Sequence, residues 1–244
     1  MINTYKESSL HRTLKELYAL EKDSKTEVEA DGHIYDILTK DGNVIEIQTQ
    51  NLGKLLRKIQ DALSKNRSCK IVHPLAVSKT IETYSEDGII LKKSRSPKKQ
   101  NEYTMLKELT GLYPILLEKN FTLEILFVKT TEIRTKPKIP EQSENKRRRF
   151  KKDWQKTDKK LNEIMETKTF SSAKNYLELL PENLPEEFCA KDIAVAFKND
   201  KTKPKNASNF SNLIAWLFVR MNIFEQTSSK GRTKFYKILE KFKY

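Results

Sequence analysis

The chain has 244 residues, with 47 Lys and Arg against 33 Asp and Glu, so its formal net charge is +14. This length suits one large domain or two small ones. The best apolar run, residues 213–219, is too short to cross a membrane, and residues 1–7 lack the apolar core of a signal peptide. Two cysteines cannot build a disulfide framework or a four-ligand zinc site, and three histidines argue against a His-rich metal centre. We therefore expect a cytoplasmic protein with no membrane partner.

The positive charge is concentrated in two segments. Residues 134–160 have 12 basic and 4 acidic side chains, and residues 198–244 have 11 and 3. Clustered positive charge of this kind binds polyanions by neutralising phosphates and releasing counterions. DNA or RNA is therefore the expected partner. A lysine-rich composition that serves only solubility is the alternative.

The N-terminal part of the chain predicts a helix, a three-stranded meander, a second helix and a strand. Leucines at helical spacing indicate a helix over 8–20. Asp-Gly turns at 31–32 and 41–42 separate strands at 26–30, 33–39 and 43–49. An amphipathic helix over 52–64 then leads to a strand at 70–73, which Pro74 is expected to end. A helix between two strands predicts parallel pairing of those strands.

The middle of the chain predicts further strands and then a linker. A hairpin is expected from 79–84 and 89–93, helices over 102–117 with an interruption near Pro114, and a strand over 121–134. Residues 136–157 have no apolar periodicity, include two prolines and are strongly basic, which is typical of a linker. The first domain is therefore expected to span residues 1–135.

The remaining residues, 158–244, predict a second, smaller domain. Helices are expected over 158–170, 172–180, 189–198 and 206–221, followed by a hairpin over 223–238. Trp216 lies in an apolar stretch and is predicted to be buried, and His73 is predicted to be a structural histidine.

Two acidic residues interrupt otherwise apolar neighbouring strands. Asp36 lies in the second strand of the meander and Glu46, with Gln48 two residues on, lies in the third. Side chains on a strand alternate with period two, so Glu46 and Gln48 share a face. Two carboxylates buried close together are costly unless a cation neutralises them, and Mg²⁺ is a suitable cation. Two solvent-facing acids at strand ends are the alternative.

This arrangement resembles the restriction-endonuclease-like, PD-(D/E)xK phosphodiesterase superfamily, in its E-x-Q variant. The resemblance implies an α/β fold with a mixed sheet flanked by helices, and a helix–meander–helix–strand core that matches residues 8–73. It also implies that Asp36 and Glu46 are ligands of Mg²⁺ or Mn²⁺, that Gln48 positions the attacking water, and that Glu16 supports the metal. Gln48 stands where the superfamily usually has Lys, and Lys54 or Lys58 on the next helix could restore that charge.

The C-terminal domain resembles a small winged helix-turn-helix DNA-binding domain, fused here to the nuclease-like domain. Such domains present the leading end of one helix to base edges and a hairpin to the backbone. The residues expected to contact nucleic acid there are Lys205, Asn206, Ser208, Asn209, Asn212, Lys230 and Arg232. Basic residues of two loops, Arg95, Lys98, Arg147 and Arg148, are expected to contact the backbone. A helical protein-interaction domain is the alternative.

Together these resemblances imply a Mg²⁺-dependent DNA endonuclease of restriction, defence or repair. The alternative is a non-catalytic DNA-binding regulator or adaptor with a degenerate nuclease core. RNA stays open as the target, and a homodimer is an option because many such nucleases pair to cut both strands. Segments 70–75, 95–99 and 120–127 also resemble a prokaryotic family of uncharacterised proteins, which carries no function to transfer.

Overall fold

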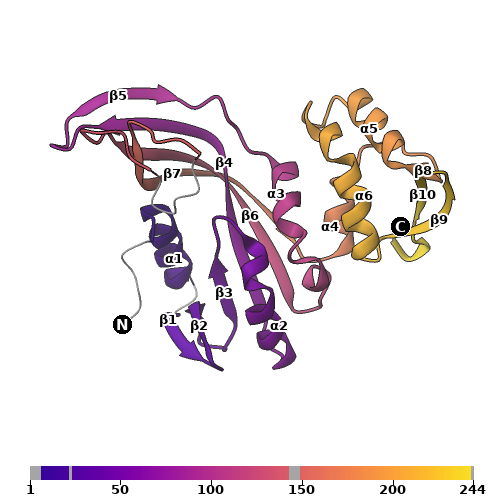
Figure 1. Ribbon diagram of the computed structural model, residues 1–244. Helices are drawn as coiled ribbons and strands as arrows, with labels where there is room; N and C mark the ends of the chain where they lie inside the picture. The colour runs from indigo at the N-terminus through magenta and orange to yellow at the C-terminus, as the bar shows by residue number, and fades with distance from the viewer. Residues whose placement is uncertain (1–6, 22–23, 143–148, 243–244) are drawn as a thin grey trace.

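The computed structural model describes residues 7–21, 24–142 and 149–242 (Figure 1). It opens with helix α1 (Ser9–Glu21), then the strands β1 (Lys25–Ala30), β2 (His33–Leu38) and β3 (Val44–Ile47). These strands form the antiparallel meander that the two Asp-Gly turns predict, and Gly32 and Gly42 both have positive φ. The short helix η2 (Leu52–Leu55) and helix α2 (Leu56–Ser64) follow, as predicted over 52–64.

The large sheet is mixed. Its later members are β4 (Cys69–Tyr84), β5 (Ile90–Arg95), β6 (Phe121–Thr135) and β7 (Gln155–Phe170), with α3 (Glu102–Leu109) and η3 (Tyr113–Ile115) between β5 and β6. The strand order is β1-β2-β3-β4-β6-β7, and β5 pairs with the outer half of β4. β4 runs parallel to β3 and to β6, because helices connect these strands. The fold is thus α/β, with a mixed sheet flanked by helices.

Pro74 does not end its strand, contrary to the prediction. β4 continues through Pro74 to Tyr84, and Pro74 is opposite Leu126 of β6. The backbone N–H of Ala76, on the same side of the strand as Pro74, donates to the side chain of Gln100 and not to β6. β3 ends at Ile47, opposite Val72. The missing N–H of Pro74 therefore faces a side of β4 where no strand requires it.

The predicted helix over 158–170 is wrong, and this moves a domain boundary. β7 pairs antiparallel with β6 from Gln155, opposite Thr135, to Phe170, opposite Leu123. Three register shifts interrupt the ladder, so the side chains lose the period-two alternation that marks a strand in sequence. Residues 158–170 therefore belong to the large sheet, and not to a second domain that begins at 158.

The C-terminal unit begins after β7. It contains α4 (Ala173–Leu177), β8 (Phe188–Cys189), α5 (Ala190–Asn199), η4 (Ala207–Phe210), α6 (Ser211–Arg220), β9 (Phe224–Lys230), β10 (Thr233–Ile238) and η5 (Glu240–Phe242). The predicted helices near 172–180, 189–198 and 206–221 and the closing hairpin are confirmed. β8, β10 and β9 form a small antiparallel sheet in that order.

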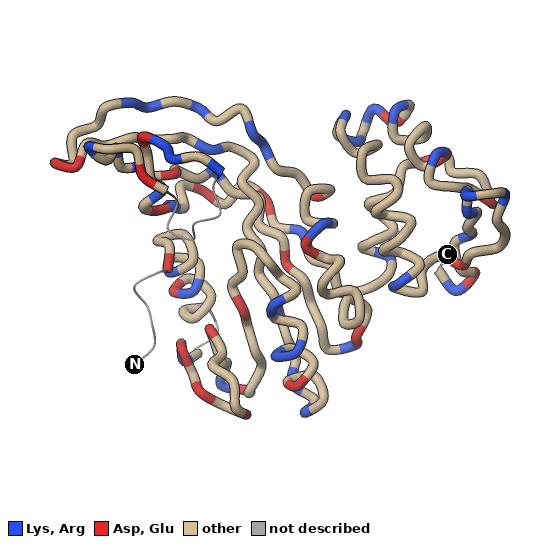
Figure 2. Tube along the Cα trace, in the orientation of Figure 1, with Lys and Arg blue, Asp and Glu red and all other residues tan. Residues whose placement is uncertain are grey.

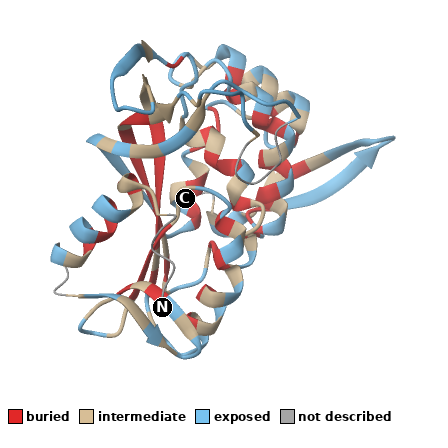
Figure 3. Ribbon diagram, turned by 60° about the vertical axis from the view of Figure 1, so that its left-hand side comes forward, coloured by how far each residue is buried: buried red, intermediate tan, exposed pale blue. Residues whose placement is uncertain are grey.

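Two hydrophobic cores lie on opposite faces of the large sheet. Along β3, Val44 faces the core that includes α2 and α3, whereas Ile45 faces α1, as alternation requires. Figure 3 shows the buried residues gathered on the sheet and on the helix sides that face it. The α1 core is the smaller one.

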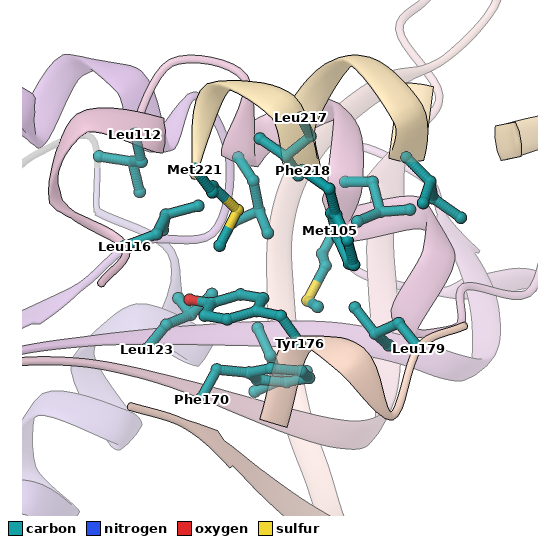
Figure 4. Packing of buried hydrophobic residues seen from close by; sticks show 14 of the residues in the cluster. Met105, Leu112, Leu116, Leu123, Phe170, Tyr176, Leu179, Leu217, Phe218 and Met221 are labelled. Carbon is teal, nitrogen blue, oxygen red and sulfur yellow. The ribbon is translucent and has the colours of Figure 1, made fainter. Parts of the chain in front are cut away.

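The larger core continues without interruption into the C-terminal unit. Met105 of α3, Leu123 of β6 and Phe170 of β7 pack with Tyr176 of α4 and with Phe218 of α6 (Figure 4). Tyr103 contacts the rings of both Phe197 and Phe210, and its hydroxyl donates to the carbonyl oxygen of Leu179 at 2.9 Å. The two units therefore share one apolar interior and are not joined by a free linker.

Candidate functional site

Asp36 and Glu46 meet where β2 and β3 separate. The ladder between these strands contains the pairs Leu38–Val44 and Ile37–Ile45 and goes no further. Beyond Ile37 and Ile45, the carboxylates of Asp36 and Glu46 accept hydrogen bonds from backbone N–H groups that the facing strand no longer pairs. The backbone N–H of Ile47 donates to Asp36 Oδ2 at 2.8 Å, and the N–H of Asp36 donates to Glu46 Oε1 at 3.2 Å. The meander therefore brings both predicted carboxylates to one fork between two strands.

Asp36 has a partner on α1. His11 Nε2 lies 3.3 Å from Asp36 Oδ2, and His11 Nδ1 lies 3.3 Å from the carboxylate of Glu7. Burial disfavours the charged form of Asp36, but the hydrogen bond and charge of His11 and the N–H of Ile47 outweigh it and hold its pKa below the usual value. Asp36 is thus an ionised carboxylate at neutral pH.

Glu46 has a partner on α2, on the other face of the sheet. Its side chain is almost fully buried, with the whole residue 2% exposed, and its Oε1 lies 2.5 Å from Lys58 Nζ. Lys58 also donates to the carbonyl oxygen of Ile34 and lies over the ring of Tyr35. Burial and the negative charge of Asp36 raise the pKa of Glu46 to about 7, against the attraction of Lys58. Glu46 therefore changes its charge near neutral pH.

The two acids have the chemistry of a divalent-cation site, although it is incomplete. Asp36 Oδ1 and Glu46 Oε2 make no hydrogen bond or ion pair within the described residues, and hard cations such as Mg²⁺ prefer carboxylate oxygen. A cation at the fork would relieve the repulsion that raises the pKa of Glu46. Over the described part of the chain, however, no three His, Cys, Asp or Glu side chains converge as metal ligands. Asp36 and Glu46 could thus hold Mg²⁺ only with water and substrate oxygens beside them.

The other two predicted catalytic residues make no hydrogen bond or ion pair with Asp36 or Glu46 among the described residues. The amide of Gln48 donates from Nε2 to the carbonyl oxygen of Gln50 at 2.7 Å. Glu16 is exposed on α1 and borders a shallow hollow with Ala19 and Ser24. It lies about 140° around the helix from His11, because each residue advances about 100°. The α1 residue that reaches Asp36 is therefore His11 and not Glu16.

Sequence reasoning missed His11 and left Lys58 as one of two candidates. The spacing of Lys54 and Lys58 in the predicted helix gave no reason to choose between them, but Lys54 of η2 is exposed and only Lys58 of α2 contacts Glu46. His73, by contrast, is structural as predicted. It is 3% exposed and its Nδ1 lies 2.6 Å from the carbonyl oxygen of Gln48, while burial lowers its pKa.

The predicted nucleic-acid residues at the leading end of α6 lie partly against the large sheet's helices. Asn206 accepts a hydrogen bond from the side chain of Asn101, just before α3. Phe210 packs on Tyr103 and lies under the ammonium group of Lys107. Lys205, Asn206 and Asn209 are exposed, whereas Ser208 is half-buried. Most of the predicted residues at this end are thus open, although Asn206 is also hydrogen-bonded to the other unit.

The remaining predicted basic contacts are exposed where the structure describes them. Lys230 and Arg232 flank Gly231 at the tip of the β9–β10 hairpin, Arg95 is the last residue of β5, and Lys98 lies in the loop after it. Lys and Arg appear along both regions in Figure 2. Arg147 and Arg148 lie outside the described residues.

A cleft between α6 and the β9–β10 hairpin adds residues that sequence reasoning did not select. Asn212 and Arg232, both predicted, line it together with Lys191, Trp216, Arg220 and Lys234. Trp216 is 41% exposed, so its predicted burial is wrong. The signal that could have found it is the spacing of Asn212, Trp216 and Arg220, which places them on one face of a helix.

A family model described as a domain of unknown function, DUF8091, matches residues 8–171. That match covers more than half of the chain. The chain belongs to the DUF8091 family. The DUF8091 match runs from α1 to one residue past β7, which agrees with the structural finding that β7 completes the large sheet.

Other comparisons extend the DUF8091 match without adding an activity. An uncharacterised protein of Treponema pallidum (strain Nichols) is 29% identical over 237 residues, which are 97% of this chain and 87% of that protein. This similarity thus includes the C-terminal unit as well as the DUF8091 region. No solved structure matches the chain. Among the described residues, no helix has the length and apolar character needed to span a membrane.

Proposed function

We propose that this protein is a metal-dependent phosphodiesterase that cleaves nucleic acid, with DNA as the first substrate to test. The observation that carries the proposal is the meeting of Asp36 and Glu46 at the fork of β2 and β3, where the Asp36 carboxylate accepts from the N–H of Ile47 and the Glu46 carboxylate accepts from the N–H of Asp36. The order of helix, meander, helix and strand around this fork is the order that the PD-(D/E)xK resemblance implies.

Within the proposal, Asp36 and Glu46 hold Mg²⁺ or Mn²⁺ through the oxygens that the fork leaves unpaired. The bound ion would acidify a water and neutralise charge on a phosphodiester. Lys58 supplies positive charge beside Glu46 and so takes the role that the superfamily's usual lysine would have. His11 orients Asp36 from the opposite face of the sheet. Gln48 keeps the proposed role of positioning a water only if its amide turns from the carbonyl of Gln50.

The C-terminal unit supports DNA binding within the same proposal. Its order α4, β8, α5, α6 and hairpin, with a three-stranded sheet, resembles that of a winged helix, which supports this part of the proposal. Residues 198–244 have 11 basic and 3 acidic side chains, which favours a polyanionic partner.

The test is cleavage of supercoiled plasmid in Mg²⁺ or Mn²⁺. We expect nicking or linearisation by the wild type and a loss of at least about a hundredfold in Asp36→Asn and Glu46→Gln. Glu16→Gln is the matched control, because Glu16 is an exposed acid outside the fork, and it should cleave normally. No cutting of DNA or RNA by the wild type in either metal would overturn the proposal.

A non-catalytic nucleic-acid-binding regulator is the second candidate. Two observations favour it: His11 and Lys58 already contact the two carboxylates, and the amide of Gln48 is hydrogen-bonded to the carbonyl oxygen of Gln50. Equal nucleic-acid binding by the wild type and Asp36→Asn, with no cleavage by either, would select this candidate.

A further inference from the structure

The cleft between α6 and the β9–β10 hairpin has the size of a ligand site. Its volume is about 800 Å³, within the range of roughly 300–1,000 Å³ of small-molecule sites. Most of its lining comes from the C-terminal unit, but Tyr113 of η3 reaches it from the other unit. Both parts of the chain therefore shape this surface.

One face of α6 presents an aromatic ring to the cleft. Asn212, Trp216 and Arg220 lie one turn apart along the helix and are all exposed, whereas Leu217 and Phe218 are fully buried. Trp216 is one of two tryptophans in the chain and leaves 41% of its surface open. A tryptophan that the core does not require offers a broad apolar surface to a partner.

Neighbouring side chains hold this ring in place. The rings of Trp216 and Tyr113 form an edge-to-face pair with centroids 5.7 Å apart. The guanidinium of Arg220 lies 5.7 Å from the Trp216 ring and 5.9 Å from that of Tyr113. A planar ligand would thus meet a platform that is already ordered, which lowers the entropy lost on binding.

The charge of the cleft is entirely positive. Four basic side chains line it, Lys191, Arg220, Arg232 and Lys234, and the described lining includes no acidic residue. None of the four makes an ion pair with a described acidic residue. Phosphate groups are the anions that such a set of lysines and arginines suits.

We propose that this cleft binds an unpaired nucleotide of single-stranded nucleic acid, with the base stacked on Trp216 and the flanking phosphates along the four basic side chains. A flat aromatic face can stack only on a base that is not already stacked within a duplex, and stacking with basic surroundings is the usual means of holding single strands. This inference rests on the proposal that the protein acts on nucleic acid, and it names the form of the strand.

The test measures binding without cleavage, in metal-free buffer with EDTA. In Trp154→Phe, Trp216 is the sole tryptophan, and we expect a 12-nucleotide oligo(dT) to quench its fluorescence saturably. By anisotropy of the labelled oligonucleotide, Trp216→Ala should bind about tenfold more weakly, as loss of one stacked base predicts. Trp216→Phe should recover most of the affinity. Trp154→Ala is the matched control, since Trp154 lies outside the cleft, against Arg134.

Two comparisons separate stacking from charge and from duplex recognition. An abasic strand of equal length should bind more weakly than oligo(dT) and should be insensitive to Trp216→Ala. A 12-base-pair duplex should bind more weakly than oligo(dT) and should not quench Trp216. Equal binding of the abasic strand, or tighter binding of the duplex, would overturn the inference in favour of a phosphate surface or a duplex reader.

Two further controls keep the outcomes distinct. Arg232→Ala changes only an exposed hairpin side chain, so it should fold normally and weaken oligo(dT) and abasic strand alike. Circular dichroism and the thermal midpoint check the fold of Trp216→Ala. Quenching by oligo(dT) in a protein that cleaves nothing would sustain the cleft and reject the phosphodiesterase. Cleavage of nucleic acid without quenching of Trp216 would sustain the phosphodiesterase and reject the cleft as the binding site.

Discussion

Asp158 of β7 accepts two hydrogen bonds from Ser9, the first residue of α1, although 149 positions separate them. The backbone N–H of Ser9 donates to Asp158 Oδ1 at 2.8 Å, and its hydroxyl donates to Oδ2 at 2.5 Å. The carboxylate thus caps a helix start from another element. Because α1 also presents His11 to Asp36, the position of β7 bears on the geometry of the fork.

Asp158→Ala should lower the free energy of unfolding by about 1 kcal/mol, since it removes a capping acceptor from α1. Urea denaturation followed by circular dichroism measures this change. Asp158→Asn keeps one acceptor oxygen, so its free energy of unfolding should fall by less. Asp153→Ala removes an exposed acid nearby and serves as the control. An Asp158→Ala protein as stable as the wild type would contradict the capping role.

Glu46 should make the protein less stable as pH rises. Its pKa in the folded state is about 7, above the ordinary value of 4.5, so the folded protein binds more protons than the unfolded chain between these values. The stabilisation that protonated Glu46 gives the folded state is fully present below pH 4.5 and is lost as pH rises through 7. Glu46→Gln removes this titration. The free energy of unfolding of the variant, measured against that of the wild type, should therefore rise by on the order of 2–3 kcal/mol from pH 5 to pH 8. Urea titrations at both pH values measure it, and a pH-independent difference would contradict it.

Lys58→Met should destabilise the protein at pH 8 more than at pH 5. At pH 8 it leaves the ionised Glu46 buried without its cation, which costs about 3 kcal/mol, whereas at pH 5 Glu46 can take up a proton. Urea denaturation at the two pH values gives the comparison. In the double variant with Glu46→Gln most of the loss at pH 8 should disappear. Lys54→Met, on an exposed turn of the same helical segment, is the control.

Tyr103→Ala should weaken the whole molecule and not one unit alone. The ring contacts Phe197 and Phe210, and its hydroxyl bonds to Leu179, so its removal leaves a cavity between the two units. A loss of about 3–5 kcal/mol is expected, with Tyr103→Phe costing about 1 kcal/mol. Calorimetry should show one transition, moved to lower temperature. Separate transitions of the two units in the wild type would contradict a shared core.

The sequence by itself determined the elements whose partners lie close along the chain. The Asp-Gly turns set the meander, and the meander brings Asp36 and Glu46 together across ten positions, so the fork could be predicted from local pairing alone. The helices at 52–64, 172–180, 189–198 and 206–221 likewise follow from apolar periodicity and caps.

Only the tertiary structure decided what depends on distant partners. β7 is a strand because β6 pairs with it, which overrides a local composition rich in Lys and Glu, and its bulges hide the alternation. His11 and Lys58 reach the acids because α1 and α2 pack on opposite faces of one sheet. Trp216 is open because the hairpin leaves a cleft beside it. Short-range periodicity carries no information about which residues distant in the chain lie close in space. These contacts therefore could not be predicted from the sequence.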